Sequence, residues 1–83
     1  MNEMDKYIIL KSTIENKISN KLSFSYEEVK KEILEQGGII NFGGYTLGTH
    51  IERLEDKKIL CYNAKLDKFQ VLWFTKEYNT FYE

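Results

Sequence analysis

The sequence contains few of the residues that covalent or metal cross-links require. None of its 83 residues is proline, and only Cys61 is cysteine. A single cysteine can neither close an internal disulfide nor supply a cysteine cluster for zinc, so no metal site is expected. A lone thiol is also typical of a reducing compartment, which predicts a cytoplasmic location.

Long hydrophobic runs are lacking too. The sequence has no run of about 18 apolar residues, which is close to the length that a membrane-spanning helix needs. The N-terminal segment MNEMDKY contains acidic residues and no extended apolar core, unlike a signal peptide. We therefore expect no membrane partner.

A surplus of positive charge is missing as well. Lys and Arg number 12 against 13 Asp and Glu, which gives a net charge of −1. A protein that coats nucleic acid non-specifically is usually strongly basic, so that class is disfavoured. A sequence-specific binder remains compatible, because such a protein can gather its positive charge on one face.

What the sequence does contain predicts one small α+β domain spanning residues 1–83. Hydrophobic residues make up 42% of the chain and aromatic residues 14%, enough to form a core. Apolar residues recur every three or four positions in three segments, which predicts helices over residues 3–19, 25–36 and 46–57. The residues of these stripes are Tyr7, Leu10, Ile14 and Ile18, then Val29 and Ile33, then Leu47, Ile51 and Leu54.

The second helix has a defined start and end. Ser25 and Glu28 are expected to form a capping box, in which the serine oxygen accepts the backbone N–H of Glu28 and the glutamate side chain reaches back to the start of the helix. Gly37 is well placed to end the helix in a left-handed conformation. The segment that follows, residues 38–44 (GIINFGG), is interpreted as a loop that packs over the core. No Lys-Ser or Lys-Thr pair follows its glycines, so a phosphate-binding P-loop is not expected.

Glycine within the third helix calls for an explanation. Gly48 is expected to cost about 1 kcal/mol there relative to alanine. Close packing against another helix, or close approach to a backbone, would account for it.

Alternating residues predict two strands, over residues 59–63 and 69–74, joined as a hairpin by a polar turn. A short extended strand is also expected over residues 22–24. The remaining tail, residues 75–83, places aromatic residues at helical spacing, which is compatible with a short C-terminal helix.

The run THIERLEDKKIL resembles the third helix and first wing strand of winged helix-turn-helix transcription regulators. In that superfamily a pattern such as R-H-L-x-R-L on the helix precedes a glycine and an apolar strand, and here residues 49–54 and 59–60 match it. The resemblance implies three helices followed by a two-stranded β-hairpin wing. Two departures are Lys58, in the place of the usual glycine, and the long connection before Tyr45.

The resemblance also implies that double-stranded DNA is the partner, with the third helix in the major groove and the wing on the backbone. Residues of types that can contact bases are Tyr45, Thr46, Thr49, His50 and Arg53. Residues that can reach phosphates are Lys57 and Lys58 at the helix end and Lys65 and Lys68 at the wing tip. The protein would act as a small transcriptional regulator.

The charges on the same stretch favour an alternative. Residues 45–68 contain five Lys and Arg but also four Asp and Glu, a difference of only +1. A weakly basic face predicts weak binding by a monomer. The alternative is a winged-helix module that binds a protein, such as a phage or mobile-element inhibitor of a host protein.

A homodimer would double the DNA contacts and match a two-fold operator. Apolar residues in excess of what a small domain can bury are candidates for its interface, namely Ile9, Tyr78, Phe81 and Tyr82. No catalytic constellation is present, because Cys61 and His50 have no activating neighbours in the sequence, so neither an enzyme nor a cofactor is expected.

Overall fold

The computed structural model of the protein describes residues 2–72, which form three helices and two β-hairpins. The helices are α1 (Glu3–Ser19), α2 (Tyr26–Glu35) and α3 (Leu47–Asp56). One hairpin joins β1 (Asn41–Phe42) to β2 (Tyr45–Thr46), and the other joins β3 (Leu60–Asn63) to β4 (Lys68–Val71). The predicted α+β class, with three helices before a two-stranded hairpin, is confirmed. The order is compatible with a winged-helix layout.

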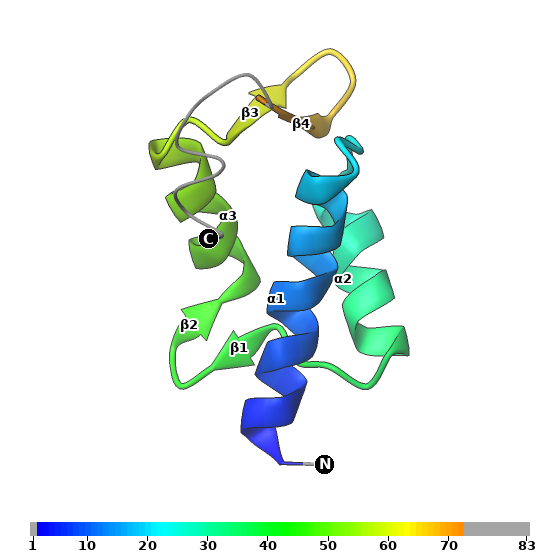
Figure 1. The fold of residues 1–83 in the computed structure, drawn as a ribbon, viewed down its shortest axis with the longest axis vertical. Coiled ribbons are helices and arrows are strands. Elements are labelled where there is room, and N and C mark those ends of the chain that lie inside the picture. The colour runs from blue at the N-terminus through cyan, green and yellow to red at the C-terminus, as the bar shows by residue number, and fades with distance from the viewer. Residues whose placement is uncertain (1, 73–83) are drawn as a thin grey trace.

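The two hairpins lie at opposite ends of the helices. Figure 1 shows β1–β2 at the end where α1 begins and β3–β4 at the end where α1 finishes, with α2 and α3 on different sides of α1. In the register of β3–β4, Leu60 pairs with Val71 and Asn63 pairs with Lys68. This hairpin stands where the sequence predicts a wing.

The predicted apolar stripes form the core. All the predicted positions of the three helices are buried except Tyr7, which is partly buried and packs against the others. The buried apolar residues come from all three helices, the α1–α2 connection and the start of the second hairpin: Leu10, Ile14, Ile18, Phe24, Val29, Ile33, Leu47, Ile51, Leu54, Ile59 and Leu60. Burial of side chains of this size stabilises a fold by about 1.5–3 kcal/mol each, so the helices are held by this common core.

Each helix begins at a side-chain cap. The side chains of Asn2, Ser25 and Thr46 accept the backbone N–H groups of the residues three positions later. The predicted cap at Ser25 is thus confirmed, with 3.1 Å between its Oγ and the N atom of Glu28. Such caps satisfy N–H groups that have no partner within the helix.

The helices also share one way of ending. After α3, the N–H of Lys58 donates to the carbonyl of Glu55 and the N–H of Ile59 donates to that of Leu54. This pair of bonds requires a left-handed residue, and Lys58 adopts it with φ of 64°. Lys21 and Gly37 close α1 and α2 with positive φ in the same manner. Lysine in the usual glycine place therefore leaves the geometry of the helix end unchanged.

The segment over residues 38–44 differs from its predicted form. It is not only a loop, because Phe42 pairs with Tyr45 across the turn of an antiparallel hairpin. Gly43 and Gly44 form that turn with φ of 55° and 91°. Positive φ at both central residues is the requirement of the tight turn that suits a two-residue hairpin, and glycine meets it without strain. The hairpin places the start of α3 beside α1.

A single residue takes the place of the strand predicted over residues 22–24. Phe24 forms a bridge with Phe69 of β4, and the N–H group of each residue donates to the carbonyl of the other at 3.1 and 2.7 Å. Their rings also contact, with centroids 5.6 Å apart. Phe24 therefore ties the β3–β4 hairpin to the connection between α1 and α2.

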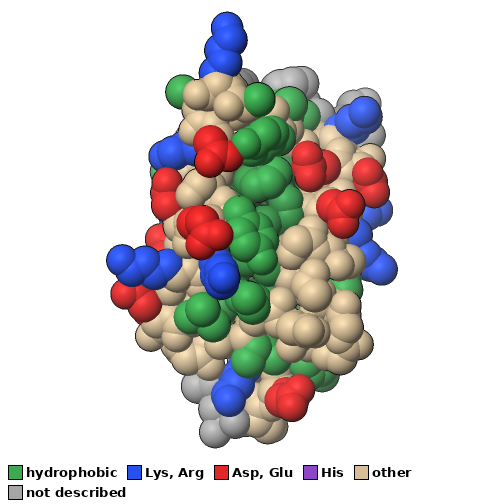
Figure 2. Space-filling model, turned by 180° about the vertical axis from the view of Figure 1, so that it is seen from behind, with side chains coloured by type: hydrophobic (Ala, Val, Ile, Leu, Met, Phe, Trp, Pro, Cys, Tyr) green, Lys and Arg blue, Asp and Glu red, His purple; other side chains and the backbone are tan. Residues whose placement is uncertain are grey.

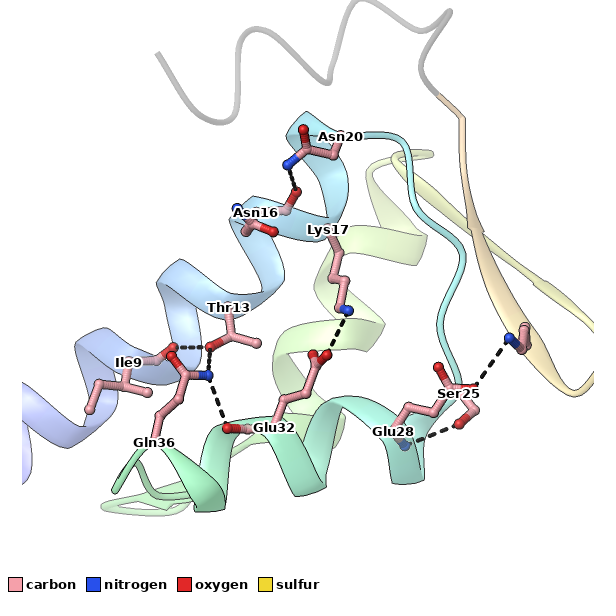
Figure 3. A network of polar contacts seen from close by, with 10 residues as sticks. Ile9, Thr13, Asn16, Lys17, Asn20, Ser25, Glu28, Glu32 and Gln36 are labelled. Carbon is pink, nitrogen blue, oxygen red and sulfur yellow. Dashed lines mark hydrogen bonds and ion pairs between the residues drawn. The ribbon is translucent and has the colours of Figure 1, made fainter.

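Polar side chains join α1 to α2 (Figure 3). Lys17 and Glu32 form an ion pair with 2.9 Å between Nζ and Oε1. The Gln36 side chain donates to the hydroxyl of Thr13 at 3.1 Å, and that hydroxyl donates to the carbonyl of Ile9 at 2.7 Å. These contacts fix the register of α2 along α1.

We predict that alanine at Gly38 destabilises the fold. A Cβ atom there would lie 2.8 Å from methyl groups of both Ile9 and Ile33 and 3.0 Å from the Ile33 carbonyl. Overpacking of this kind lowers the free energy of unfolding by about 1–3 kcal/mol. Urea denaturation of Gly38→Ala measures the change.

Gly48→Ala is the matched control, because within the described part of the chain a Cβ atom there meets the Thr46 hydroxyl alone, at an ordinary contact distance of 3.7 Å. It is expected to raise the free energy of unfolding by about 0.5–1 kcal/mol, since alanine is the better helix former. Changes of the same sign in the two variants would contradict this account of the packing.

Candidate functional site

The exposed face of α3 carries charges of both signs. Thr49, Glu52, Arg53 and Asp56 follow one another at spacings of three, one and three, so they share one side of the helix. All are exposed except Thr49, which is half-buried. The pKa of the neighbouring Glu55 carboxyl is raised by partial burial and by the carboxylates of Glu52 and Asp56. The face thus presents one cation between two acids.

The beginning of α3 is polar and open. The Thr46 hydroxyl accepts the N–H of Thr49 at 3.1 Å and lies 3.0 Å from the Thr49 hydroxyl. Among residues 2–72, apart from the neighbouring residues and the backbone of α3 itself, only the Thr46 hydroxyl comes within 4 Å of where a Cβ atom of residue 48 would stand. The predicted packing of Gly48 against another helix is therefore wrong, and room remains there for close approach of another backbone.

The structure places His50 in the interior rather than on the exposed face. Only 2% of the residue is accessible, so it cannot reach a base edge without unfolding the helix from the core. Its Nδ1 atom is hydrogen-bonded to the Tyr45 hydroxyl at 2.7 Å. Its Nε2 atom has no partner among the described residues. We therefore remove His50 from the candidate base contacts.

Tyr45 connects this buried histidine to the surface. The Arg53 guanidinium lies over the Tyr45 ring, 5.2 Å from its centroid. On α1, the Tyr7 ring meets Tyr45 edge to face at 5.8 Å and stacks on Phe42 at 4.7 Å. Sequence reasoning missed this aromatic cluster, since its members come from α1, β1, β2 and α3 and share no periodicity.

The lysines predicted to reach phosphates differ in their surroundings. Lys57 and Lys58 at the end of α3 and Lys65 in the turn of the β3–β4 hairpin are exposed. Lys68 is half-buried and forms an ion pair with Glu28 of α2, with 3.2 Å between Nζ and Oε1. Lys57, Lys58 and Lys65 are thus the more exposed of the four lysines.

Side chains order the tip of the β3–β4 hairpin. The Oδ1 atom of Asn63 accepts the N–H groups of Lys65 and Leu66 at 3.0 and 3.3 Å. The Tyr62 hydroxyl donates to the carboxylate of Asp67. The backbone of Asp67 is left-handed, with φ of 53°. These bonds hold Lys65 at the outer end of the hairpin.

The face turned away from the viewer in Figure 1 is partly apolar. Figure 2 shows a band of apolar side chains that runs from the hairpin end down the middle of this face, with acidic and basic side chains on both sides. Large apolar residues that are exposed on the surface of residues 2–72 include Leu66 at the hairpin tip and Leu34 on α2.

The predicted dimer residues are only partly within the described chain. Ile9 is half-buried and packs against the core beside Gly38, which accounts for its apolar side chain within one protomer. Tyr78, Phe81 and Tyr82 lie outside residues 2–72, as do the C-terminal tail and the last predicted residues of the second wing strand. The homodimer stays a prediction.

A cleft of about 540 Å³ lies between α1 and α2. Its lining includes Thr13, Lys17, Glu32 and Gln36, which bond to one another across the cleft. We interpret these polar groups as structural, because their hydrogen-bonding capacity is already used between the two helices.

Comparisons with protein-family models, curated proteins and solved structures find no match for the chain. Among residues 2–72, no three His, Cys, Asp or Glu side chains are grouped to hold a metal ion. Over the same residues, no helix combines the length and apolar character needed to cross a membrane.

We predict that the protein loses stability in mild acid, because the imidazole of His50 is buried. Desolvation, with repulsion from Lys11 and Arg53, lowers the pKa of His50 from 6.5 to about 4. As the pH falls, the unfolded chain therefore takes up a proton before the folded protein does. The stability that His50 contributes is complete above pH 6.5 and is lost toward pH 4, by on the order of 2 kcal/mol between about pH 7 and pH 5.

Urea denaturation at these two pH values measures the loss in the wild type and in His50→Asn, which removes the titrating ring. The variant is expected to be less stable at neutral pH but to lose less on acidification. An equal loss in both proteins would show that His50 is not the group responsible.

Proposed function

We propose that the protein binds double-stranded DNA as a small transcriptional regulator, with the N-terminal half of α3 in the major groove and the β3–β4 hairpin on the backbone. The observation that carries the proposal is the exposed Arg53, whose guanidinium lies over the Tyr45 ring on the outer side of α3. Arginine is the side chain best suited to a bidentate contact with guanine.

The surroundings of Arg53 support this assignment. Thr46 and Thr49 place hydroxyl groups toward the start of the same helix, where base contacts are usual. The open space at Gly48 leaves room for a DNA backbone to approach the first turn. Lys57, Lys58 and Lys65 continue the exposed basic residues toward the hairpin tip.

The charge pattern sets the expected strength of binding. Three exposed lysines correspond to a slope of about −3 for the logarithm of affinity against the logarithm of salt concentration. A homodimer would double this number. Glu52 and Asp56 oppose binding, because they present negative charge to the phosphates from the same face as Arg53.

We expect a pool of duplexes with randomised sequence, selected at low salt, to yield an enriched sequence. Lys65→Ala should then reduce the salt slope by about 1 and leave base preference unchanged, because a phosphate contact carries no sequence information. Glu52→Gln is the matched variant, which removes a negative charge instead of a positive one, and it should strengthen DNA binding. Fluorescence anisotropy over a salt series measures both. Absence of binding to every duplex at low salt would refute the proposal.

Gly48→Ala provides a separate check of the docking geometry. It should weaken DNA binding although it stabilises the helix, because the added methyl group occupies the space at the first turn of α3. The affinity for the enriched duplex and the free energy of unfolding are measured on the same variant. Unchanged affinity in a stabilised variant would mean that no backbone approaches Gly48.

A second candidate function is binding to a basic protein partner. The observation that favours it is the pair of exposed carboxylates, Glu52 and Asp56, beside Glu55 on α3. Under this function Glu52→Gln weakens binding, whereas in DNA binding it strengthens it. Recovery of a stoichiometric partner that resists nuclease and is lost with Glu52→Gln would favour this candidate over DNA.

A further inference from the structure

We infer that Tyr45 and His50 are positioning residues, which aim Arg53 and thereby set the base preference at the position that Arg53 reads. This inference rests on the proposed function and assigns roles to two residues that the sequence suggested as direct base contacts. Tyr45 bonds inward to His50 and presents its ring to Arg53, so it joins a buried group to an exposed one.

Of the three residues in contact, His50, Tyr45 and Arg53, the histidine is held in place by the core. His50 is 2% exposed and lies on the same side of α3 as Leu47, Ile51 and Leu54, all of which are buried. A ring in this position moves only with the helix. The 2.7 Å bond from its Nδ1 atom therefore holds the Tyr45 hydroxyl at a constant place relative to α3.

The Tyr45 ring is also held from the side of α1. Tyr7 meets it edge to face with centroids 5.8 Å apart, and the two rings lie at 88°. Tyr7 is itself stacked on Phe42, the residue that pairs with Tyr45 across the β1–β2 hairpin. A change in the χ1 rotamer of Tyr45 would break the hydrogen bond to His50, and a tilt of the ring would break the edge-to-face contact with Tyr7. The ring therefore forms a fixed platform for the Arg53 guanidinium.

The charges around His50 favour the neutral form of its imidazole. The titratable and charged groups that act on it are Lys11 from α1, Tyr45 from β2, and Arg53 one turn further along α3. A proton on the imidazole would place a third cation among Lys11 and Arg53. The neutral ring avoids repelling Arg53 from the Tyr45 face.

An arginine that rests on a rigid ring has fewer conformations to lose when it contacts a base. The orientation of its guanidinium plane is also defined in the free protein, and a bidentate contact with a base depends on this orientation. Loss of the ring should therefore affect discrimination between bases more than it affects overall affinity.

The test compares Arg53→Ala, Tyr45→Leu, Tyr45→Phe and the double variant Arg53→Ala with Tyr45→Leu, each first checked for folding by thermal melting. The probe is the pool of duplexes with randomised sequence. Arg53→Ala and Tyr45→Leu should each reduce discrimination at one shared base position by about tenfold, and the double variant should add no further loss. Tyr45→Phe keeps the ring and loses the bond to His50, so it should have an intermediate effect.

A purely structural role for Tyr45 would instead lower affinity for all duplexes alike, and losses that add in the double variant would overturn the inference. A second measurement does not depend on DNA. The Arg53 Hδ protons of the free protein should resonate upfield in the NMR spectrum through the Tyr45 ring current, and this shift should vanish in Tyr45→Leu. No difference between the two spectra overturns the positioning role. The shift without any DNA binding overturns the proposed function alone.

Discussion

The hydrogen bond between Tyr45 and the buried imidazole of His50 links three parts of the fold. It connects β2 to α3, and through the contact of Tyr45 with Tyr7 it connects both to α1. The bond is buried at the histidine end, where an unpaired polar atom would be costly, by about 1–3 kcal/mol. A polar contact thus joins the β1–β2 hairpin to α3, in addition to the aromatic contacts of the hairpin with α1 and the common apolar core of the helices.

This constraint also separates two kinds of residue on α3. The buried side uses leucine, isoleucine and histidine to fix the helix, and the exposed side keeps Arg53 between Glu52 and Asp56. Exposed ion pairs contribute only about 0–1 kcal/mol to stability, so the fold does not require this arrangement of charges. The acids limit non-specific attraction to phosphates, which makes any DNA binding depend more on contacts with bases.

The sequence predicted the helices well because burial of an apolar face decides where they form. It did not predict the β1–β2 hairpin, since strands of two residues carry no alternation and Gly43-Gly44 was interpreted as part of a loop. A Gly-Gly pair is nevertheless a recognised signal for a two-residue turn. The ion pair between Lys68 and Glu28 was also missed, because it depends on how the wing sits over α2.

The candidate site was harder to predict from the sequence than the fold. On a helical wheel His50 flanks the apolar stripe, so its residue type alone allows either a surface or a core position. Burial follows from Tyr45, which a tight turn brings within hydrogen-bonding distance. The exposure of Arg53 and of Lys57 and Lys58 after α3 was easier to predict, since long charged side chains are rarely buried without a partner.

The lysine that ends α3 shows how stability and surface charge combine at one position. A non-glycine residue in the left-handed conformation loses about 1–2 kcal/mol relative to its usual conformations. A cation at a helix C-terminus recovers about 0.3–1 kcal/mol from the helix dipole, which offsets only part of that loss. Gly37 shows that the same turn forms with glycine at the end of α2. Lys21 ends α1 with a positive φ as well, so lysine is accepted at this place in two of the three described helices. At position 58 it also adds a positive charge between the end of α3 and β3.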